Sequence, residues 1–380
     1  MIRIGILGFG SMGRTHAYCV ENMKYFYNNL PFDARVCGVY TPRWEKTSAI
    51  AKTFGIPFAA ENEEELIHSP NIDVIDICTP NVFHYETLKK AILAGKHIYC
   101  EKPLCITAAQ AIEISELADT RKIIGQVVFN NRFLAPIIKM KELLDGNKLG
   151  KLYSFRSEYR HASCVNPKKP AGWKQVREIC GGGVLFDLGS HAIDLLTFLC
   201  GKFKEKNGAP CITGRSQIAH PIRAGLDGSP WQTDADEAFY AIGELENGAV
   251  GTIEANKLAT GENDGLKIEL YGEYGALKFD LMDLNYLYYY DNSHPVITDD
   301  LGASRGFTAI ECVGRYPAPG GVFPGRKAPA GWLRGHLGSM YAFLSSVYSG
   351  IPATPSFREA AYIQQVMEHL YTNDFSCFHK

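Results

Sequence analysis

Over residues 1–129, short apolar runs alternate with segments whose apolar residues recur at helical spacing. The short runs are rich in β-branched residues, which is typical of strands buried on both faces. Strands separated by helices of this length predict a parallel, doubly wound α/β sheet. The predicted strands are 2–7, 34–40, 71–78, 96–100 and 123–129, and the predicted helices are 14–27, 44–54, 61–68, 84–94 and 107–120.

A different pattern follows residue 130. A helix is predicted at 137–144, and alternating apolar and polar residues predict a strand at 152–160. Beyond Gly201, strands are separated by turn sequences such as Glu246-Asn247-Gly248, which favour antiparallel hairpins. We therefore predict a doubly wound domain at 1–129 and an α+β domain with a mostly antiparallel sheet at 130–380. The later strands are predicted at 212–218, 237–245, 249–256, 266–272, 276–281 and 285–290, and a capping box of Ser356 and Glu359 predicts a last helix at 356–372.

Composition narrows the class of protein. Of 380 residues, 46% are apolar and 21% are charged, with a formal net charge of -2, so nothing in the charge balance favours nucleic acid or an anionic membrane as a partner. Glycines interrupt the apolar N-terminus too early for a signal peptide, and no apolar run approaches the roughly 20 residues of a membrane span. The eleven cysteines show no Cys-x-x-Cys pair and no zinc-type spacing. We therefore expect a cytoplasmic protein without a bound metal.

The residues directly after the first strand form the pattern G-x-G-x-x-G: Gly8, Phe9, Gly10, Ser11, Met12 and Gly13. Between a strand and a helix, the first glycine permits the tight turn, the second lets a pyrophosphate approach the backbone, and the third lets helix and strand pack closely. The N–H groups that begin the helix then face the phosphates. The pattern predicts a dinucleotide-binding Rossmann domain; the alternative is a glycine turn that binds no ligand.

The end of the second predicted strand leaves the choice between NAD and NADP open. NAD-binding folds usually carry Asp or Glu there, on the ribose hydroxyls, whereas this chain has Tyr40-Thr41-Pro42-Arg43. Thr41 is a candidate partner for a ribose hydroxyl. Arg43 is a candidate partner for a 2′-phosphate, although it can equally stack on adenine or face water. One arginine beside a rigid proline is a thin phosphate site, so the sequence favours NAD only slightly.

The strand predicted at 96–100 ends in Glu101-Lys102-Pro103. Ligands of open α/β sheets collect at the carboxyl ends of strands, so Lys102 is expected to point to the place where cofactor and substrate meet. Pro103 restricts the backbone of the residue before it and presents the lysine from a stiff turn. The alternative is a solvated turn after a core strand, and the neighbouring motifs favour the functional interpretation.

A second group of reactive side chains follows the glycine run at 181–183. Asp187 and His191 are four residues apart, so on a helix they would lie on one face. Gly189 between them weakens a helix, which indicates that another group approaches closely. The alternative is that Asp187 only caps the apolar helix that follows.

Together these motifs resemble the Gfo/Idh/MocA family, the family of glucose–fructose oxidoreductase and myo-inositol dehydrogenase. The resemblance rests on the glycine pattern at 8–13, on Cys78-Thr79-Pro80-Asn81 followed by His84, on Gly95-Lys96-His97 leading to Glu101-Lys102-Pro103, and on the segment 181–194. It implies an N-terminal Rossmann domain and a C-terminal domain with a large open sheet that binds substrate and forms oligomers. It also implies NAD(P)-dependent oxidation or reduction of a sugar, cyclitol or related polyol, and a cis peptide bond before Pro103.

The resemblance further implies roles for individual residues. His191 would act as general acid/base, Asp187 would orient and polarise its ring, and Lys102 would stabilise the developing alkoxide, although lysine and histidine can exchange roles. A histidine suits proton transfer because its unperturbed pKa of about 6.5 is near the working pH. Cofactor contacts are expected from residues 8–13 and from Thr41, Arg43, Cys78, Thr79, Pro80, Asn81, His84, Glu101 and Lys102, with Glu101 on the nicotinamide ribose. Substrate contacts are expected from Asn131, Arg160, His161, Trp173 and His191.

Three functions share parts of these motifs. The first is a dehydrogenase that oxidises a secondary hydroxyl of a sugar, cyclitol or glycoside and exchanges its cofactor. The second keeps the cofactor bound and uses transient sugar oxidation for hydroxyl–ketone exchange or glycosidic cleavage. The third, a dinucleotide sensor without turnover, is disfavoured because Lys102, Asp187 and His191 are all present. By resemblance we expect a homodimer or homotetramer formed through the C-terminal sheet.

Overall fold

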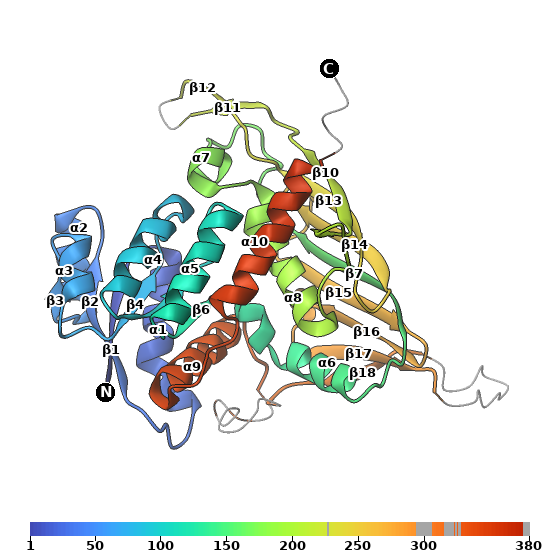
Figure 1. The fold of residues 1–380 in the computed structure, drawn as a ribbon, viewed down its shortest axis with the longest axis horizontal. Coiled ribbons are helices and arrows are strands. Elements are labelled where there is room, and N and C mark those ends of the chain that lie inside the picture. Colours follow the sequence, from blue (N-terminus) through green and yellow to red (C-terminus); the bar gives the residue numbers. More distant parts are fainter. Residues whose placement is uncertain (226–227, 294–305, 315–322, 324, 326–327, 375–380) are drawn as a thin grey trace.

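The computed structural model describes residues 1–225, 228–293, 306–314, 323, 325 and 328–374. Two large sheets dominate it, and helices lie between them and around the first one (Figure 1). The first sheet is built from the N-terminal third of the chain and the second from residues between 152 and 311.

The first sheet has six parallel strands in the order β3-β2-β1-β4-β5-β6. The order reverses beside β1, and α/β sheets bind ligands at such a switch point. The doubly wound sheet predicted from the sequence is therefore confirmed. Its strands are β1 (Ile2–Leu7), β2 (Ala34–Tyr40), β3 (Phe58–Ala59), β4 (Val74–Ile77), β5 (His97–Cys100) and β6 (Gly125–Val127), and its helices are α1 (Ser11–Phe26), α2 (Trp44–Phe54), α3 (Glu63–His68), α4 (His84–Leu93) and α5 (Ala108–Thr120).

Local sequence explains where these helices begin and end. Gly55, directly after α2, has a left-handed backbone with φ 65°, and Gly95, beyond α4, has φ 74°. Such conformations end a helix and suit glycine. The side chain of Thr107 accepts a hydrogen bond from the backbone N–H of Gln110 and so caps the start of α5.

The second sheet has eight strands in the order β10-β13-β14-β7-β15-β16-β17-β18. Its neighbours are antiparallel except for β14 and β7, so the predicted mostly antiparallel sheet is confirmed. The strands are β7 (Leu152–Arg160), β10 (Ile212–Gln217), β13 (Ala238–Glu244), β14 (Val250–Asn256), β15 (Gly265–Gly272), β16 (Gly275–Asp280), β17 (Tyr286–Asp291) and β18 (Thr308–Glu311). Two small hairpins, β8 (Glu205–Lys206) with β9 (Ala209–Pro210) and β11 (Ile222–Ala224) with β12 (Pro230–Gln232), were not predicted.

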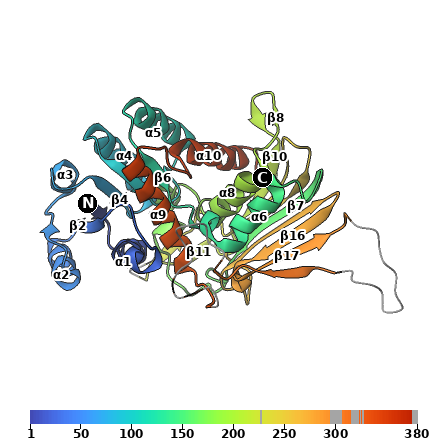
Figure 2. The same cartoon turned by 90° about the horizontal axis from the view of Figure 1, so that it is seen from below.

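Alternation along the strands gives this sheet two different faces. In β13, Phe239 and Ala241 are buried, whereas Tyr240 and Ile242 are 44% and 52% exposed. The buried face packs on α6 (Ala135–Asp145), α8 (Ser190–Cys200) and α10 (Phe357–Thr372), which lie on the side of the first sheet (Figure 2). Among the residues that the structure describes, the opposite face carries exposed side chains such as Tyr240 and Ile242.

The two C-terminal helices return to the N-terminal half. Helix α9 (Leu333–Ser349) packs on α1, and the hydroxyl of Tyr99 in β5 donates a 2.7 Å hydrogen bond to Ser339. Helix α10 packs on α5 and starts with the predicted capping box of Ser356 and Glu359. The domain division at residue 129 stays a prediction; it separates the strands of the two sheets, while both C-terminal helices also contact the first half.

One apolar helical stretch, 177–200, is long enough to cross a membrane by length and composition. It joins α7 (Arg177–Cys180), a π-helical turn η4 (Leu185–Gly189) and α8. Of its most apolar window, 78% is buried inside the protein, so packing between the two sheets accounts for its apolar residues.

Candidate active site

A single cavity of about 1150 Å³ runs from the glycine loop of the first half to the helices and strands of the second. It brings together the carboxyl ends of β1, β2, β4 and β5 with η4, α8 and the end of β14. Most of the predicted site residues line it: Gly8, Phe9, Gly10, Ser11, Met12, Thr41, Cys78, Thr79, Pro80, Asn81, Glu101, Lys102, Asn131, His161, Trp173, Asp187 and His191.

The glycine loop fits a pyrophosphate. A Cβ atom on Gly8, which has φ +89°, would lie 2.7 Å from the carbonyl oxygen of Cys78, and one on Gly13 would lie 2.3 Å from the carbonyl oxygen of Gly8. A Cβ on Gly10 would meet nothing within 4 Å and would occupy the space that a phosphate needs. The first turn of α1 has no acidic residue and no side-chain cap, so its N–H groups are available to an anion. Gly13 acts through packing and does not line the cavity itself.

The end of β2 differs from the prediction. The hydroxyl of Thr41 is 2.8 Å from that of Thr47 and 3.2 Å from the carbonyl oxygen of Arg43, so it is engaged within the turn that starts α2. Thr41 lines the cavity, but its hydroxyl already has partners. The exposed side chain of Arg43 lies outside the lining, whereas Lys46, one turn along, lines it.

His84 supports the loop after β4 but does not contribute its side chain to the cavity lining. The Nδ1 atom of His84 lies 2.9 Å from the carbonyl oxygen of Pro103, and its Nε2 lies 2.9 Å from that of Thr79. His84 is fully buried and does not line the cavity, so it supports the turns after β4 and β5. The Lys102–Pro103 peptide bond is cis, as the resemblance implies.

The buried imidazole of His16 contacts the carboxylate of Glu101. His16 of α1 is hydrogen-bonded to Asp76 at 3.0 Å, and its Nε2 lies 3.3 Å from the Glu101 carboxylate. Burial alone would raise the pKa of Glu101. The hydrogen bond from His16 and the charges of His16 and Lys102 outweigh this effect and lower the pKa to about 2. Glu101 is therefore an anion at the wall of the cavity. The thiol of Cys78 lies 3.2 Å from Nδ1 of His16. Hydrogen bonds among His16, Asp76 and Cys78 therefore account for this group of buried polar side chains.

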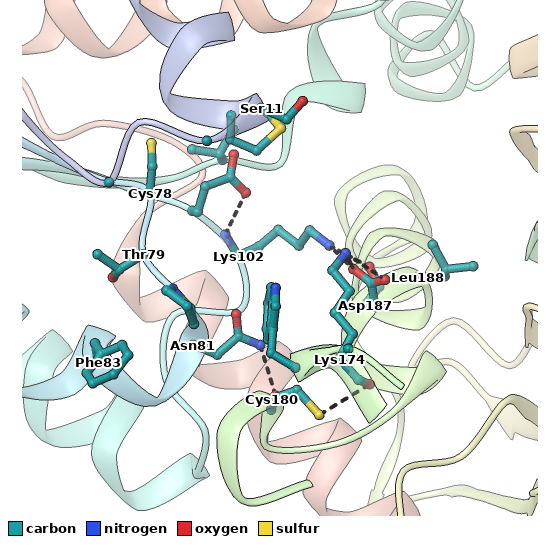
Figure 3. A pocket seen from close by; sticks show the side chains of 18 of the residues that line it. Ser11, Cys78, Thr79, Asn81, Phe83, Lys102, Lys174, Cys180, Asp187 and Leu188 are labelled. Atoms are coloured by element: carbon teal, nitrogen blue, oxygen red, sulfur yellow. Dashed lines mark hydrogen bonds and ion pairs between the residues drawn. The ribbon is translucent and has the colours of Figure 1, made fainter. Parts of the chain in front are cut away.

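Lys102 reaches across the cavity to Asp187. Its ammonium donates to the main-chain carbonyl of Asp187 at 2.6 Å and to Oδ1 at 3.0 Å. Asp187 lies in the π-helical turn η4, a kind of turn that occurs frequently at functional sites. The contact joins the carboxyl end of β5 to the helical layer of the second half (Figure 3).

Two further lysines share the same carboxylate. Lys174, in the 3₁₀ turn η3 (Trp173–Gln175), donates to both carboxylate oxygens of Asp187 at 2.8 and 2.9 Å, and Lys257, just after β14, lies 2.9 Å from Oδ2. Figure 3 shows Lys102 and Lys174 converging on Asp187. Burial opposes ionisation of Asp187, but the ammonium groups of Lys257, Lys102 and Lys174 hold its pKa well below the usual range. One carboxylate and three ammonium groups thus face one end of the cavity.

The glycine run before Asp187 lets the chain approach Asp236. A Cβ on Gly183 would lie 2.1 Å from the main-chain oxygen of Asp236, whose carboxylate accepts hydrogen bonds from the N–H groups of Gly183 and Leu185. These contacts cap the helical stretch that carries Asp187. The close approach predicted at Gly189 is made by the side chains of Leu185 and Ala255.

His191 lies in the cavity but does not pair with Asp187 as predicted. Its described hydrogen bond is between Nδ1 and the amide nitrogen of Asn131, at 3.4 Å. Because an amide nitrogen donates, Nδ1 accepts and the ring proton sits on Nε2. Burial and the charge of Lys102 lower the pKa of His191 to about 3, so the ring is neutral near pH 7. The π-helical turn breaks the four-residue spacing on which the prediction of a shared face relied.

The predicted substrate residues divide into two groups. His161 and Trp173 line the cavity, and the ring nitrogen Nε2 of His161 lies 2.9 Å from Asp264. Arg160 does not line it; its guanidinium pairs with Glu158 at 2.8 Å and with Glu262 at 3.3 Å. Tyr159, the preceding residue in β7, lines the cavity in its place.

Sequence reasoning missed several cationic and aromatic positions in the lining, among them Lys46, Lys174, Lys257 and His336. Lys174 was the easiest of these residues to predict, because it directly follows Trp173, a predicted substrate residue in a glycine-flanked loop. His336 and its neighbour Trp332 come from α9, whose return to the first half leaves no local sequence signal.

Comparison with known proteins agrees with this geometry. Residues 2–129 match the model of the GFO/IDH/MocA oxidoreductase family with its NAD-binding Rossmann fold, and residues 137–278 match the C-terminal domain of the same family. The chain belongs to the GFO/IDH/MocA family. Residues 2–129 therefore form an NAD-binding Rossmann domain, and the resemblance noted in the sequence is confirmed.

Several similar proteins are named as sugar dehydrogenases. Levoglucosan dehydrogenase of Pseudarthrobacter phenanthrenivorans is 27% identical over 368 residues, which cover 94% of this chain and 92% of that protein. Glucose-6-phosphate 3-dehydrogenase of Bacillus subtilis is 25% identical over 98% of this chain and 97% of its own. A solved structure of levoglucosan dehydrogenase with NADH and levoglucosan is 26% identical, with a TM-score of 0.91 over 98% of this chain and 96% of that one.

Proposed function

We propose that this protein is an NAD-dependent dehydrogenase that oxidises a secondary hydroxyl of a sugar or glycoside to a ketone, or reduces the ketone. The observation that carries the proposal is the shared cavity: the glycine loop for a pyrophosphate and the group Lys102, Asp187 and His191 open into the same space. Relatives named as levoglucosan, glucoside and inositol dehydrogenases support the substrate class.

The chain divides the work of the reaction among its residues. The bound dinucleotide supplies the hydride acceptor. Lys102 places a cation beside the reacting oxygen, where negative charge develops. His191, with its ring proton on Nε2, donates a hydrogen bond into the cavity, and Asp187 holds the ammonium of Lys102 in place.

The names of two relatives support one ring position as the first to test. Two of them are 3-dehydrogenases, one acting on glucose 6-phosphate and one on D-glucosides. The hydroxyl on carbon 3 of a glucopyranose ring is therefore our first candidate. Lys102 and His191 select for a hydroxyl that points between them, and the rest of the ring would contact Tyr159, His161 and Trp173.

The test is a substrate panel with purified protein and NAD or NADP. We expect reduced cofactor to accumulate with levoglucosan or a methyl glucoside, and the product to carry a ketone at carbon 3 by NMR. Ketone without net reduced cofactor would favour the enzyme with a permanently bound cofactor. Neither ketone nor reduced cofactor with levoglucosan, glucosides, glucose 6-phosphate, xylose or inositol would contradict the proposal.

The oligomer belongs to the same proposal. Tyr153, Tyr240, Ile242 and Val250 are each exposed by between 44% and 54% on the strands of the second sheet. Charged residues such as Arg156 and Glu254 share the outer face with Tyr240 and Ile242, and a surface that combines exposed aromatic and apolar residues with polar ones is typical of a subunit interface. We expect the protein to elute as a dimer or tetramer, and Ile242→Glu to shift it toward monomer in light scattering, whereas Ile351→Glu, at an exposed site just beyond α9, should not.

A further inference from the structure

Oxidation releases the proton of the substrate hydroxyl, which must then leave the cavity. Lys102, Asp187 and Lys174 form a chain of polar groups along which side-chain exposure increases. The side chain of Lys102 is 14% exposed, that of Asp187 17% and that of Lys174 45%. Successive polar atoms are 3.0 and 2.8 Å apart, so hydrogen bonds connect the inner ammonium to the half-exposed one through Oδ1 of Asp187. Exposure therefore increases along a continuous chain of three groups.

The other polar groups at this end are less suited to carry the proton. His191 uses Nδ1 as an acceptor toward Asn131, so its free nitrogen already carries a hydrogen. Lys257 contacts Oδ2, and its side chain is 6% exposed, so it is the most buried of the three lysines. Lys257 is best understood as the cation that fixes Asp187. Lys174 is the most exposed member of the cluster, with 45% of its side chain accessible.

We infer that Lys174 relays the proton of the substrate hydroxyl between the cavity and solvent, by way of Asp187 and Lys102. The inference rests on the proposed function, because it gives a role to a residue beside the reacting position of that dehydrogenase. It assigns Lys174 as a proton-relay residue that acts through Lys102.

The charges and protons balance in each step of oxidation. The cycle starts with Lys102 and Lys174 as ammonium groups on the carboxylate of Asp187. Lys174 first releases a proton to water and becomes a neutral amine. Asp187 then receives a proton from Lys102 and passes one to Lys174 in concert, so the carboxylate stays an anion. The amine of Lys102 takes the hydroxyl proton while the substrate carbon gives its hydride to the dinucleotide, which restores both ammonium groups; reduction reverses these steps.

Burial and the neighbouring ammonium groups lower the pKa of Lys174 from its ordinary value. Lys174 faces Asp187 of η4, Lys102 after β5 and Lys257 after β14. Burial lowers the pKa of Lys174, Asp187 raises it, and the ammonium groups of Lys102 and Lys257 lower it again, with a net shift downward. A lysine beside other cations loses its proton more readily, as in lysine-dependent catalysis generally.

Lys174→Arg is the decisive variant. Arginine keeps the positive charge beside Asp187 but stays protonated at any working pH. With the sugar that is turned over fastest by the wild type, we expect kcat for oxidation to fall by about tenfold or more. The wild-type rate should rise with pH as Lys174 loses its proton, and this rise should disappear in Lys174→Arg. Lys257→Arg should keep the rise, whatever its absolute rate, and Lys168→Arg, on the exposed loop before Trp173, should match the wild type.

A second variant separates proton transfer from structure. In Lys174→Ala, added ethylamine should restore the rate, and a series of amines should restore it according to their basicity. Circular dichroism and NADH fluorescence on the same samples check that the variants fold and bind cofactor. A Lys174→Arg enzyme that keeps the wild-type rate within about twofold and the same pH profile would overturn the relay.

A measurement without turnover tests the same residue. Trace labelling of the protein with acetic anhydride over a range of pH, read out by mass spectrometry, reports when each lysine becomes a neutral amine. Lys174 should be labelled at a lower pH than Lys168; labelling of both at the same pH would contradict the inference. A wild type that oxidises no sugar of the panel would contradict the proposed function instead, and the labelling result would stand apart from it.

Discussion

The ammonium of Lys102 lies 2.6 Å from the main-chain carbonyl oxygen of Asp187, although 85 residues separate the two in the chain. This contact links the end of β5 to the helical layer of the second sheet within the cavity lining, and it places a cation where the reacting oxygen is expected. Because both residues take part, the geometry at the reacting position depends on the packing of the two halves against each other.

Lys102→Ala should abolish most turnover and leave cofactor binding intact. Removing the cation beside the developing alkoxide is expected to lower kcat by about 100-fold or more, while the glycine loop is untouched. The oxidation rate with the preferred sugar tests the loss of turnover. The dissociation constant of NADH, measured by fluorescence, tests whether cofactor binding is retained. Lys89→Ala, at a surface ion pair with Glu113, serves as the control. Near-native turnover in Lys102→Ala would remove Lys102 from the site.

Gly10→Val should prevent dinucleotide binding without unfolding the protein. A Cβ at this position would have no protein atom within 4 Å, so we expect the valine side chain to fill the place of the pyrophosphate. We expect NADH affinity to fall by about tenfold or more, with an unchanged melting temperature.

Gly13→Ala provides the contrast for this prediction. A Cβ on residue 13 would lie 2.3 Å from the carbonyl oxygen of Gly8, so Gly13→Ala should lower the melting temperature, whereas Gly10→Val should not. Tight NADH binding by Gly10→Val would show that the phosphates lie elsewhere.

The regular parts of the fold were predictable because their signals are local. β7 was placed at 152–160 and α2 at 44–54, as observed, and the capping box of Ser356 and Glu359 marked the start of α10. In such elements, periodicity, glycine conformation and side-chain caps all act within a few residues. The short hairpin strands β8 and β9, with two residues each, contain too few positions for a periodic pattern.

The site was predictable only in part, because its charges come from distant segments. Lys102 and Asp187 each follow a recognisable motif, but Lys174 and Lys257 meet Asp187 through a 3₁₀ turn and a strand end that no spacing connects. The expected pairing of Asp187 with His191 assumed an α-helix, whereas the chain forms a π-helical turn there. Thr41 was assigned to a ribose, although a neighbouring hydroxyl, that of Thr47, engages it.

The neutral, buried His191 should make the protein less stable in acid. Its pKa is lowered from 6.5 to about 3 in the folded state, chiefly by burial. Between these values the unfolded chain binds one proton more than the folded chain at this position, so acidification favours unfolding by about 1.4 kcal/mol per pH unit. The contribution is absent above pH 6.5 and grows as the pH falls toward 3.

His191→Phe should therefore reduce the slope of unfolding free energy against pH between 6.5 and 4.5 by about one proton. Urea unfolding at several pH values measures this slope. A slope that is the same in His191→Phe and the wild type would mean that His191 is not held neutral in the folded protein.

Lys46 should govern how well the protein uses NADP. No acid follows β2, the Thr41 hydroxyl is engaged internally, and Arg43 lies outside the cavity lining, which leaves Lys46 as the cation that lines the cavity near the end of this strand. A 2′-phosphate there would gain a charge-assisted contact with the ammonium, which NAD lacks. In Lys46→Glu we expect kcat/KM for NADP to fall by about tenfold or more and kcat/KM for NAD to change by less than about threefold. Lys52→Glu, on an exposed position of the same helix, makes the same change of charge away from the cavity. Equal losses with both cofactors in Lys46→Glu, or an equal loss of NADP activity in Lys52→Glu, would mean that the 2′-phosphate is recognised by another residue or by none.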